Sequence, residues 1–474
     1  MNENAFSVFL LFAPLAFAVA HPADVLSLHP TNPHYFLFRG KPTVLIGSGE
    51  HYGAVLNLAF DYIAYLDELK ANGLNHTRLF SGVYREIPSS FGITDNTLAP
   101  TAENYICPWP RSDVPGAVDG GNKFDLSKWN PAYFKRLKDF VNQASKRGII
   151  VEVSLFCPFY GDDLWEINPM NAKNNINGIG NCHREEVYTL KHKDLTELQE
   201  AVTRRIVEEL RDADNIYYEI CNEPYFGGVT MDWQKHIADV IVETEKNFPK
   251  KHLISMNIAN GSAKIENPHR AVSIFNFHYS YPPDAVAINY HLNKVIGENE
   301  TGFRGKDDVL YRTEGWDFVI AGGALFSHLD YSFSTHHPRG DLLDYQSPGG
   351  GSPTLRKQLK ILKDFIHGFD FIKMLPKNEV IKGISEGVKA RALVEEGNQY
   401  AIYIHEPPEA GKEVKEREVE ITVELPEGTY RYEWLNTKTG NVEKRRNFRH
   451  TGGYRTFISP VFKEDIALGI LRRW

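Results

Sequence analysis

Residues 216–228 read IYYEICNEPYFGG, a strongly β-forming run that is interrupted by a proline. Ile and Tyr favour a strand, whereas Pro224 cannot donate a hydrogen bond to a sheet ladder. The strand must therefore end at Asn222 and Glu223, which places an amide and a carboxylate at its carboxyl end. In barrels and open sheets of parallel strands, functional residues gather at this end.

Short apolar runs alternate with amphipathic segments on both sides of this stretch. Residues 131–146, for example, place Tyr133, Leu137 and Val141 on one helical face and are soon followed by Gly148, a helix stop. Eight strand-then-helix units can be counted, and the one after LISMNI has only a weak helix. They predict an α/β fold, a (β/α)8 TIM barrel over residues 21–375 with long insertions. An open doubly wound sheet is the alternative, but no Gly-rich phosphate turn follows the first strand.

The pattern of apolar and polar residues changes after about residue 376. Short alternating runs such as QYAIYIHE and TYRYEWLN are separated by turns containing Glu-Gly-Asn, Pro-Glu-Gly or Lys-Thr-Gly. This pattern predicts a small C-terminal antiparallel β-sandwich domain over residues 376–474. Tyr430, Tyr432 and Trp434 alternate along one of its strands, which is typical of a packed face rather than of a ligand platform.

The composition narrows the classes of partner. The 474 residues carry a net charge of -8 without a basic excess, so nucleic acid is not expected to bind. The N-terminal run FSVFLLFAPLAFAVA ends in a small-x-small pattern, which predicts a signal peptide over residues 1–20, although no Lys or Arg precedes it. We therefore expect a secreted or periplasmic protein without stable membrane insertion after signal removal. The sequence does not indicate an oligomeric state.

The four cysteines indicate neither a disulfide scaffold nor a metal site. No CxxC spacing is present, and Cys157 and Cys221 lie in or beside strand-like runs, as buried free thiols do. Cys107 and Cys182 fall in polar loops and could form one bridge in an exported protein.

Two glutamates lie at the ends of opposed barrel strands. Glu223 ends the fourth strand, and Glu298, in VIGENETG, ends the seventh. Such a pair can hydrolyse a glycosidic bond, because one carboxyl protonates the leaving oxygen while the other attacks the anomeric carbon. Glu300 is the alternative nucleophile, but strict two-residue alternation would carry its side chain past the strand end.

Asn-Glu-Pro after the fourth strand and Gly-Glu at the seventh resemble the motifs of clan A glycoside hydrolases, close in type to glycoside hydrolase family 5. The resemblance implies a retaining enzyme for β-glycosidic bonds that needs no metal and no organic cofactor. It implies Glu223 as the acid/base, Glu298 as the nucleophile and Asn222 as the amide that holds the sugar 2-hydroxyl.

The resemblance also implies further substrate-binding residues. Arg78, at the end of the second strand, would lie near the nucleophile and hold the pKa of Glu298 down. His278, in FNFHYSYPP, resembles the histidine of the sixth strand, with Tyr279 or Tyr281 as the nearby phenol.

The sequence departs from the family at two strand ends. The eighth strand ends in HLDYSF without the usual Trp, so Asp330 is a candidate sugar contact in its place. The first strand ends in SGEHYG, where Glu50 with His51 indicates a specific sugar contact. A transglycosylase using the same residues and a non-catalytic carbohydrate-binding barrel remain alternatives, and the sugar and the endo or exo mode stay open.

Overall fold

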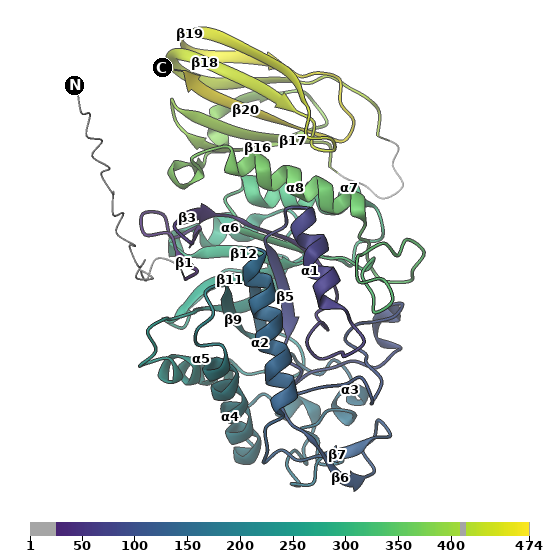
Figure 1. Ribbon diagram of the computed structural model, residues 1–474. Helices are drawn as coiled ribbons and strands as arrows, with labels where there is room; N and C mark the ends of the chain where they lie inside the picture. Colours follow the sequence, from purple (N-terminus) through teal and green to yellow (C-terminus); the bar gives the residue numbers. More distant parts are fainter. Residues whose placement is uncertain (1–24, 408–413, 474) are drawn as a thin grey trace, which may run out of the picture.

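The computed structural model describes residues 25–407 and 414–473 (Figure 1). Its centre is a parallel sheet whose eight strands are hydrogen-bonded in the order β4-β13-β12-β11-β10-β9-β8-β5. Strands β4 and β5 also lie beside each other, so the sheet nearly closes. The strands are β4 (Leu45–Gly49), β5 (His76–Phe80), β8 (Ile150–Phe156), β9 (Ile216–Cys221), β10 (Leu253–Asn260), β11 (Val272–His278), β12 (Val295–Glu300) and β13 (Leu325–Leu329). The predicted TIM barrel is confirmed.

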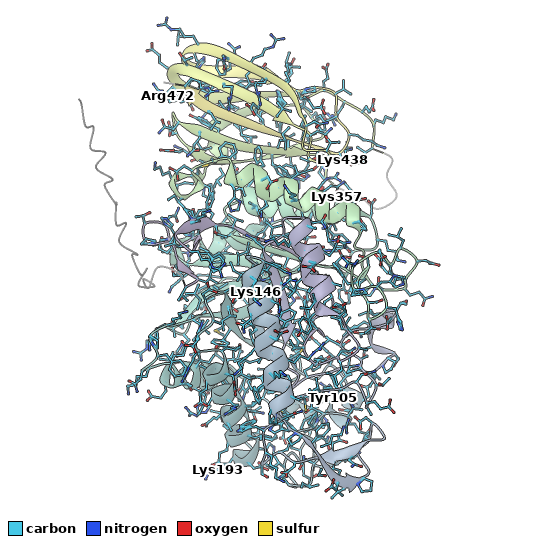
Figure 2. The ribbon with its side chains drawn as sticks, viewed as in Figure 1. Tyr105, Lys146, Lys193, Lys357, Lys438 and Arg472 are labelled. Atoms are coloured by element: carbon cyan, nitrogen blue, oxygen red, sulfur yellow. The ribbon has the colours of Figure 1, made fainter. Side chains whose placement is uncertain are left out.

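Helices connect the barrel strands and cover their outer face. They are α1 (Tyr62–Ala71), α2 (Pro131–Lys146), α4 (Lys193–Glu209), α5 (Met231–Thr244), α6 (Asp284–Asn289), α7 (Asp308–Ile320) and α8 (Pro353–His367). Helices α1, α2, α4, α5 and α8 each bury one face, whereas α7 is buried on almost every side. Lys146, Lys193 and Lys357 are exposed on α2, α4 and α8 (Figure 2). No helix occurs in residues 261–271, all of them described, which join β10 to β11 where the weak helix was expected.

Two insertions follow barrel strands and build walls at the carboxyl end of the barrel. The loop after β5 holds the hairpin of β6 (Arg111–Pro115) and β7 (Asn122–Phe124), and the loop after β8 holds α3 (Asp162–Glu166). The two insertions touch, because Phe124 N donates to Asn174 O at 2.7 Å. Short 3-10 helices occur at η2 (Ser90–Gly92), η3 (Arg184–Glu186), η4 (Tyr290–Leu292), η5 (Phe371–Lys373) and η6 (Asn378–Val380).

A small antiparallel sheet precedes the barrel. It consists of β1 (Ser27–Leu28), β2 (Phe36–Phe38) and β3 (Lys41–Thr43). Arg39 and Gly40 turn the hairpin between β2 and β3 with φ of 49° and 73°, as a two-residue turn with a right-handed twist requires. The predicted signal peptide, residues 1–20, lies outside the described residues. Within the described part of the chain no helix is long and apolar enough to cross a membrane.

The C-terminal domain is antiparallel, as expected, and its strands form one seven-stranded sheet that curls on itself. The strands are β14 (Leu375–Pro376), β15 (Ile381–Ile384), β16 (Lys389–Glu395), β17 (Gln399–His405), β18 (Glu420–Leu435), β19 (Val442–Ile458) and β20 (Asp465–Arg473). Tyr430, Tyr432 and Trp434 are buried in its core, so their alternation marks a packed face.

This domain packs on the outer wall of the barrel, over α7 and α8 (Figure 1). Arg312 of α7 forms a buried ion pair with Asp465 at 2.7 Å. The rings of Trp316 and Tyr403 stack with centroids 5.3 Å apart. The contact is therefore both charged and apolar.

All four cysteines are free thiols. The Cys107 thiol is buried and lies 3.3 Å from Trp109 O. The bridge between Cys107 and Cys182 that the sequence left open is therefore absent.

Candidate active site

A cavity of about 350 Å³ opens at the carboxyl ends of the barrel strands. Its walls are formed by residues at or beyond the carboxyl ends of seven of the eight strands, all except β13. The lining residues are His51, Tyr52, Phe80, Glu86, Phe91, Leu98, Cys157, Tyr160, Asn222, Glu223, Phe226, Asn260, Tyr279, Glu300 and Phe303.

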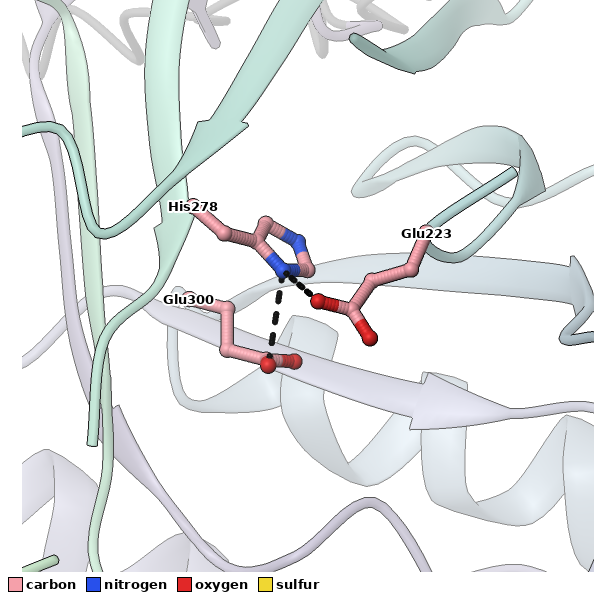
Figure 3. Close-up of side chains that lie close together, drawn as sticks. All are labelled: Glu223, His278 and Glu300. Carbon is pink, nitrogen blue, oxygen red and sulfur yellow. Dashed lines mark hydrogen bonds and ion pairs between the residues drawn. The ribbon is translucent and has the colours of Figure 1, made fainter. Parts of the chain in front are cut away.

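Two carboxylates meet in this cavity, Glu223 just after β9 and Glu300 at the end of β12. The His278 imidazole points between them, with Nδ1 3.2 Å from Glu223 Oε1 and 3.4 Å from Glu300 Oε1 (Figure 3). One oxygen of each carboxylate and one ring nitrogen all lie within 4.8 Å of one another. Glu223 has a left-handed backbone, with φ of 37°. This conformation is uncommon for a residue other than glycine, and such backbone strain clusters at active sites.

Glu300 is surrounded by donors. Its Oε2 accepts from Arg78 Nη1 at 3.0 Å and from the Tyr52 hydroxyl at 2.9 Å, while Oε1 accepts from the Tyr279 hydroxyl at 2.7 Å. Burial alone would raise the pKa of Glu300, but the charge and hydrogen bond of His278, the charge of Arg78 and the Tyr279 hydroxyl hold it well below its usual value. Glu300 is therefore ionised across the whole physiological range.

His278 carries the matching positive charge. Burial disfavours the imidazolium, yet the nearby carboxylates of Glu300 and Glu223 outweigh burial and raise the pKa of His278 to about 9. At neutral pH the protonated ring donates into the space between the two carboxylates. This is also the one cluster within the described residues that could hold a metal ion, and the imidazolium already supplies a positive charge there.

Asn222 and Tyr160 link the two catalytic candidates. Arg78 Nη2 donates to Asn222 Oδ1 at 2.7 Å, and Asn222 Nδ2 donates to the Tyr160 oxygen at 2.9 Å. The Tyr160 hydroxyl then donates to Glu223 Oε2 at 2.6 Å. The chain of donors fixes the orientation of the amide and of the carboxylate. The sequence analysis missed Tyr160, although its place in CPFY, directly beyond the third strand, was a signal.

Arg78 is anchored in turn inside the barrel. It pairs with Glu219 and lies 3.7 Å from Glu152, both fully buried. Burial and the charge of Glu219 raise the pKa of Glu152 to about 8, despite the opposing charge of Arg78. Glu219 and Glu152 therefore hold the Arg78 guanidinium inside the barrel while it donates to Glu300 in the cavity.

Glu298 does not lie in the cavity with Glu223, contrary to the sequence-based expectation. It is fully buried on the other face of β12, where Oε1 accepts from Ser280 N at 2.7 Å. Burial and the neighbouring Glu314 raise the pKa of Glu298 well above its usual value, whereas Arg78 was expected to lower it.

A bulge in β12 explains the difference. Phe277 of β11 pairs with Glu298, but the next residue, His278, pairs with Glu300, so Asn299 is one residue too many on its strand. The Asn299 amide faces the barrel interior and donates to Glu219 at 2.9 Å. The bulge breaks the two-residue alternation, and Glu300 turns into the cavity instead of past the strand end.

Three other predicted contacts lie outside the cavity. Glu50 accepts from Gly53 N at 2.9 Å and Ala54 N at 3.0 Å and so shapes the loop after β4. Asp330 forms a buried ion pair with Arg356. The Arg304 guanidinium lies 4.8 Å from the centre of the Tyr281 ring. That ring faces the C-terminal domain, where the ring centroid of His405 is 6.3 Å away.

Arg78, Asn222, His278 and Tyr279 are, by contrast, gathered around the two carboxylates. His51 and Glu86, on the opposite wall, form a pair at 3.2 Å. Burial would lower the pKa of His51, but the charge and hydrogen bond of Glu86 raise it. The sequence analysis missed Glu86, which lies in a loop without a recognisable pattern.

Solved structures with the same architecture are numerous, at low sequence identity. A candidate glycoside hydrolase from Bacteroides vulgatus aligns over 95% of this chain and 83% of its own, with 14% identity and a TM-score of 0.63. A glycoside hydrolase family 5 protein from Bacteroides vulgatus aligns over 94% of both chains, with 14% identity and a TM-score of 0.61. The fold is similar to that of glycoside hydrolases. A family 5 mannosidase from Rhizomucor miehei aligns over 74% of this chain and 100% of its own, with 12% identity and a TM-score of 0.50.

Sequence comparisons add less. Residues 97–281 match the model of a family described as a domain of unknown function, DUF6298. No curated protein has a significantly similar sequence.

Proposed function

We propose that the protein is a retaining glycoside hydrolase that cleaves β-glycosidic bonds, with Glu300 as nucleophile and Glu223 as acid/base. The observation that carries the proposal is the approach of the two carboxylates, whose nearest oxygens lie within 4.8 Å. Retaining glycosidases hold their carboxyl groups about 5–5.5 Å apart, whereas inverting enzymes need about 6.5–9.5 Å to admit a water. The likeness of the fold to glycoside hydrolases supports a carbohydrate substrate.

In the first step the ionised Glu300 attacks the anomeric carbon. The glycosidic C–O bond breaks as the new C–O bond to Glu300 forms, and the protonated Glu223 gives its proton to the leaving oxygen. Arg78 and Tyr52 donate to Glu300 Oε2 and Tyr279 donates to Oε1, so the attacking carboxylate is oriented and its charge is stabilised before the reaction.

In the second step Glu223, now ionised, takes a proton from a water that attacks the same carbon. The bond to Glu300 breaks, the sugar leaves with its original anomeric configuration, and both carboxyl groups return to their starting states. The His278 imidazolium lies within reach of both side chains, so it can stabilise whichever carboxylate is charged. Asn222, fixed by Arg78 and Tyr160, is available for the sugar 2-hydroxyl.

The proposal includes export of the protein to the periplasm or the cell exterior. It rests on the apolar run and the small-x-small pattern that end at Ala20. Cell fractionation with antibody detection, together with N-terminal sequencing of the mature chain, tests it.

Trapping of the covalent intermediate tests the nucleophile directly. A panel of 2-deoxy-2-fluoro glycosides with good leaving groups, varied in the sugar, is incubated with the full chain, and the labelled peptide is sequenced by mass spectrometry. We expect a label on Glu300 and slow inactivation that Glu300→Gln abolishes. A label on Glu298 would overturn the assignment, and turnover of an ordinary glycoside with inverted product would overturn the retaining mechanism.

A further inference from the structure

The catalytic cavity is bordered by a nearly continuous series of aromatic rings, which we call the aromatic rim. Its members are Tyr225, Phe226, Tyr160, Phe91, Phe303 and Tyr279. Each ring contacts the next, with successive centroids 5.0, 5.8, 5.7, 5.9 and 5.8 Å apart.

The rim comes from five separate parts of the chain, one of which is Tyr279, directly after β11. Phe91 belongs to the insertion after β5, Tyr160 follows β8, Phe226 follows β9, and Phe303 follows β12. Asn260, which accepts from the Tyr225 hydroxyl, lines the remaining gap toward Tyr279. The rings therefore surround the entrance instead of lining the two sides of a groove.

An enclosed entrance limits how a glycoside can bind. A polysaccharide cut in its interior must lie across both carboxylates and leave the site in two directions, and the edge contact of Phe91 with Phe303 closes one of them. The volume of about 350 Å³ also lies near the lower end of the range for ligand sites. Both observations favour a single sugar at the end of its substrate.

The chemistry of the rim differs from that of the floor. The floor presents charged or amide groups, among them Glu223, Glu300 and Asn222. The outermost rings, Phe91, Phe226 and Phe303, are 41%, 43% and 40% exposed and have no polar atom. Exposed apolar groups that cluster around a pocket indicate a binding surface. These three rings offer no hydrogen-bond partner to the hydroxyls of a polar leaving group.

We infer that the enzyme removes one terminal sugar from glycosides whose leaving group is flat and apolar, such as an aryl group, held against Phe91 and Phe303. The inference rests on the proposed function. The sugar binds the polar floor, and the leaving group remains between the exposed rings until its oxygen has been protonated.

Paired substrates test this inference. The sugar identified by trapping is supplied as an aryl glycoside, as the methyl glycoside and as a soluble polymer, and the full chain is compared with Phe91→Ala and Phe303→Ala. We expect the wild type to prefer the aryl glycoside over the methyl glycoside in KM, and to release only monosaccharide. Each variant should raise KM for the aryl glycoside about tenfold, since it removes an aromatic contact to the leaving group together with the apolar surface that the contact buries.

The methyl glycoside is the control substrate, because it lacks the aryl leaving group, and its KM should not change in either variant. Thermal unfolding verifies that the variants remain folded, which we expect because both rings are substantially exposed. Release of oligosaccharides from the polymer by the wild type, or equal KM changes for both small glycosides, would overturn the inference while leaving the hydrolase proposal intact. Failure of the proposed function would instead appear as no cleavage of any substrate and no trapped intermediate.

Discussion

Strand β12 carries two glutamates, Glu298 and Glu300, in opposite surroundings. Glu300 faces the cavity, where burial would raise its pKa but the His278 imidazolium, the Arg78 guanidinium and the Tyr279 phenol lower it. Glu298 faces the packed layer between strand and helix, where burial and a second carboxyl group raise its pKa. The same side chain, two residues apart, is thus an anion in one place and a neutral acid in the other, and the neighbours decide which.

Substitution of each glutamate by glutamine should reveal the largest difference between Glu298 and Glu300. Glu300→Gln replaces the proposed nucleophilic carboxylate by a neutral amide, so we expect kcat/KM to fall by at least about 10²–10⁴-fold, the contribution typical of a general acid or base. Glu298→Gln should leave kcat/KM unchanged, because its side chain does not reach the cavity. Steady-state kinetics on an aryl glycoside measures both, and the reverse order would restore Glu298 as nucleophile.

The cations that accompany the two glutamates provide a second contrast. Arg78→Met removes the guanidinium that pairs with the two buried carboxylates of Glu219 and Glu300, so the free energy of unfolding should fall by about 3–5 kcal/mol. The comparison variant is Arg304→Met, which removes the partly exposed partner of the buried Glu314 and should cost less than Arg78→Met, because Arg304 pairs with one carboxylate and Arg78 with two.

Urea denaturation of the full chain measures this difference. If Arg78→Met does not fold, Arg78→Lys, which keeps the charge but not the fork of donors, replaces it. Equal losses at Arg78 and Arg304 would show that the two sites have similar surroundings after all.

The phenol at Glu300 sharpens the comparison further. Tyr279→Phe removes one hydrogen bond to a charged carboxylate, worth about 1.5–3 kcal/mol, so kcat/KM should fall about 10–100-fold. The control is Tyr281→Phe, since Tyr281 contacts Arg304 outside the cavity. An equal loss in both variants would count against the assignment of Tyr279 to the site.

The smallest effect concerns pH. The raised pKa of Glu298 means that the folded protein keeps a proton that the unfolded chain releases above about pH 4.5. The proton on Glu298 therefore stabilises the folded protein fully below about pH 4.5. This stabilisation is lost as the pH rises from there to the pKa of Glu298 in the folded protein. Between pH 5 and pH 6 the stability of Glu298→Gln relative to wild type should rise by about 1.4 kcal/mol, as denaturation curves at the two pH values would measure.

The barrel could be predicted from the sequence because its strands and amphipathic helices are local patterns. The same holds for Glu223, since Pro224 fixes where the strand ends, whereas the cluster of Arg78, Asn222, His278 and Tyr279 was implied by the resemblance to clan A glycoside hydrolases. Their catalytic roles stay predictions.

The remaining site residues depend on pairing that no local pattern reveals. The bulge at Asn299 arises from the register between β11 and β12, so the choice between Glu298 and Glu300 required the backbone. Glu50 and Asp330 lie at strand ends, as Glu223 does, but neither lines the cavity. Glu50 accepts hydrogen bonds from two backbone amides, and Asp330 pairs with Arg356. Sequence position does not distinguish a carboxylate used for folding from one available to substrate.

The ion pair between Arg312 and Asp465 makes the barrel dependent on the sheet that follows it. A gene fragment that ended near residue 375 would encode a barrel with the Arg312 guanidinium uncovered on α7 and the Trp316 ring without the stacked Tyr403. Recombination could then not exchange this C-terminal domain freely, as it exchanges modules joined by linkers. Because α7 directly follows the strand that carries Glu300, the proposed nucleophile and the appended sheet should be inherited together.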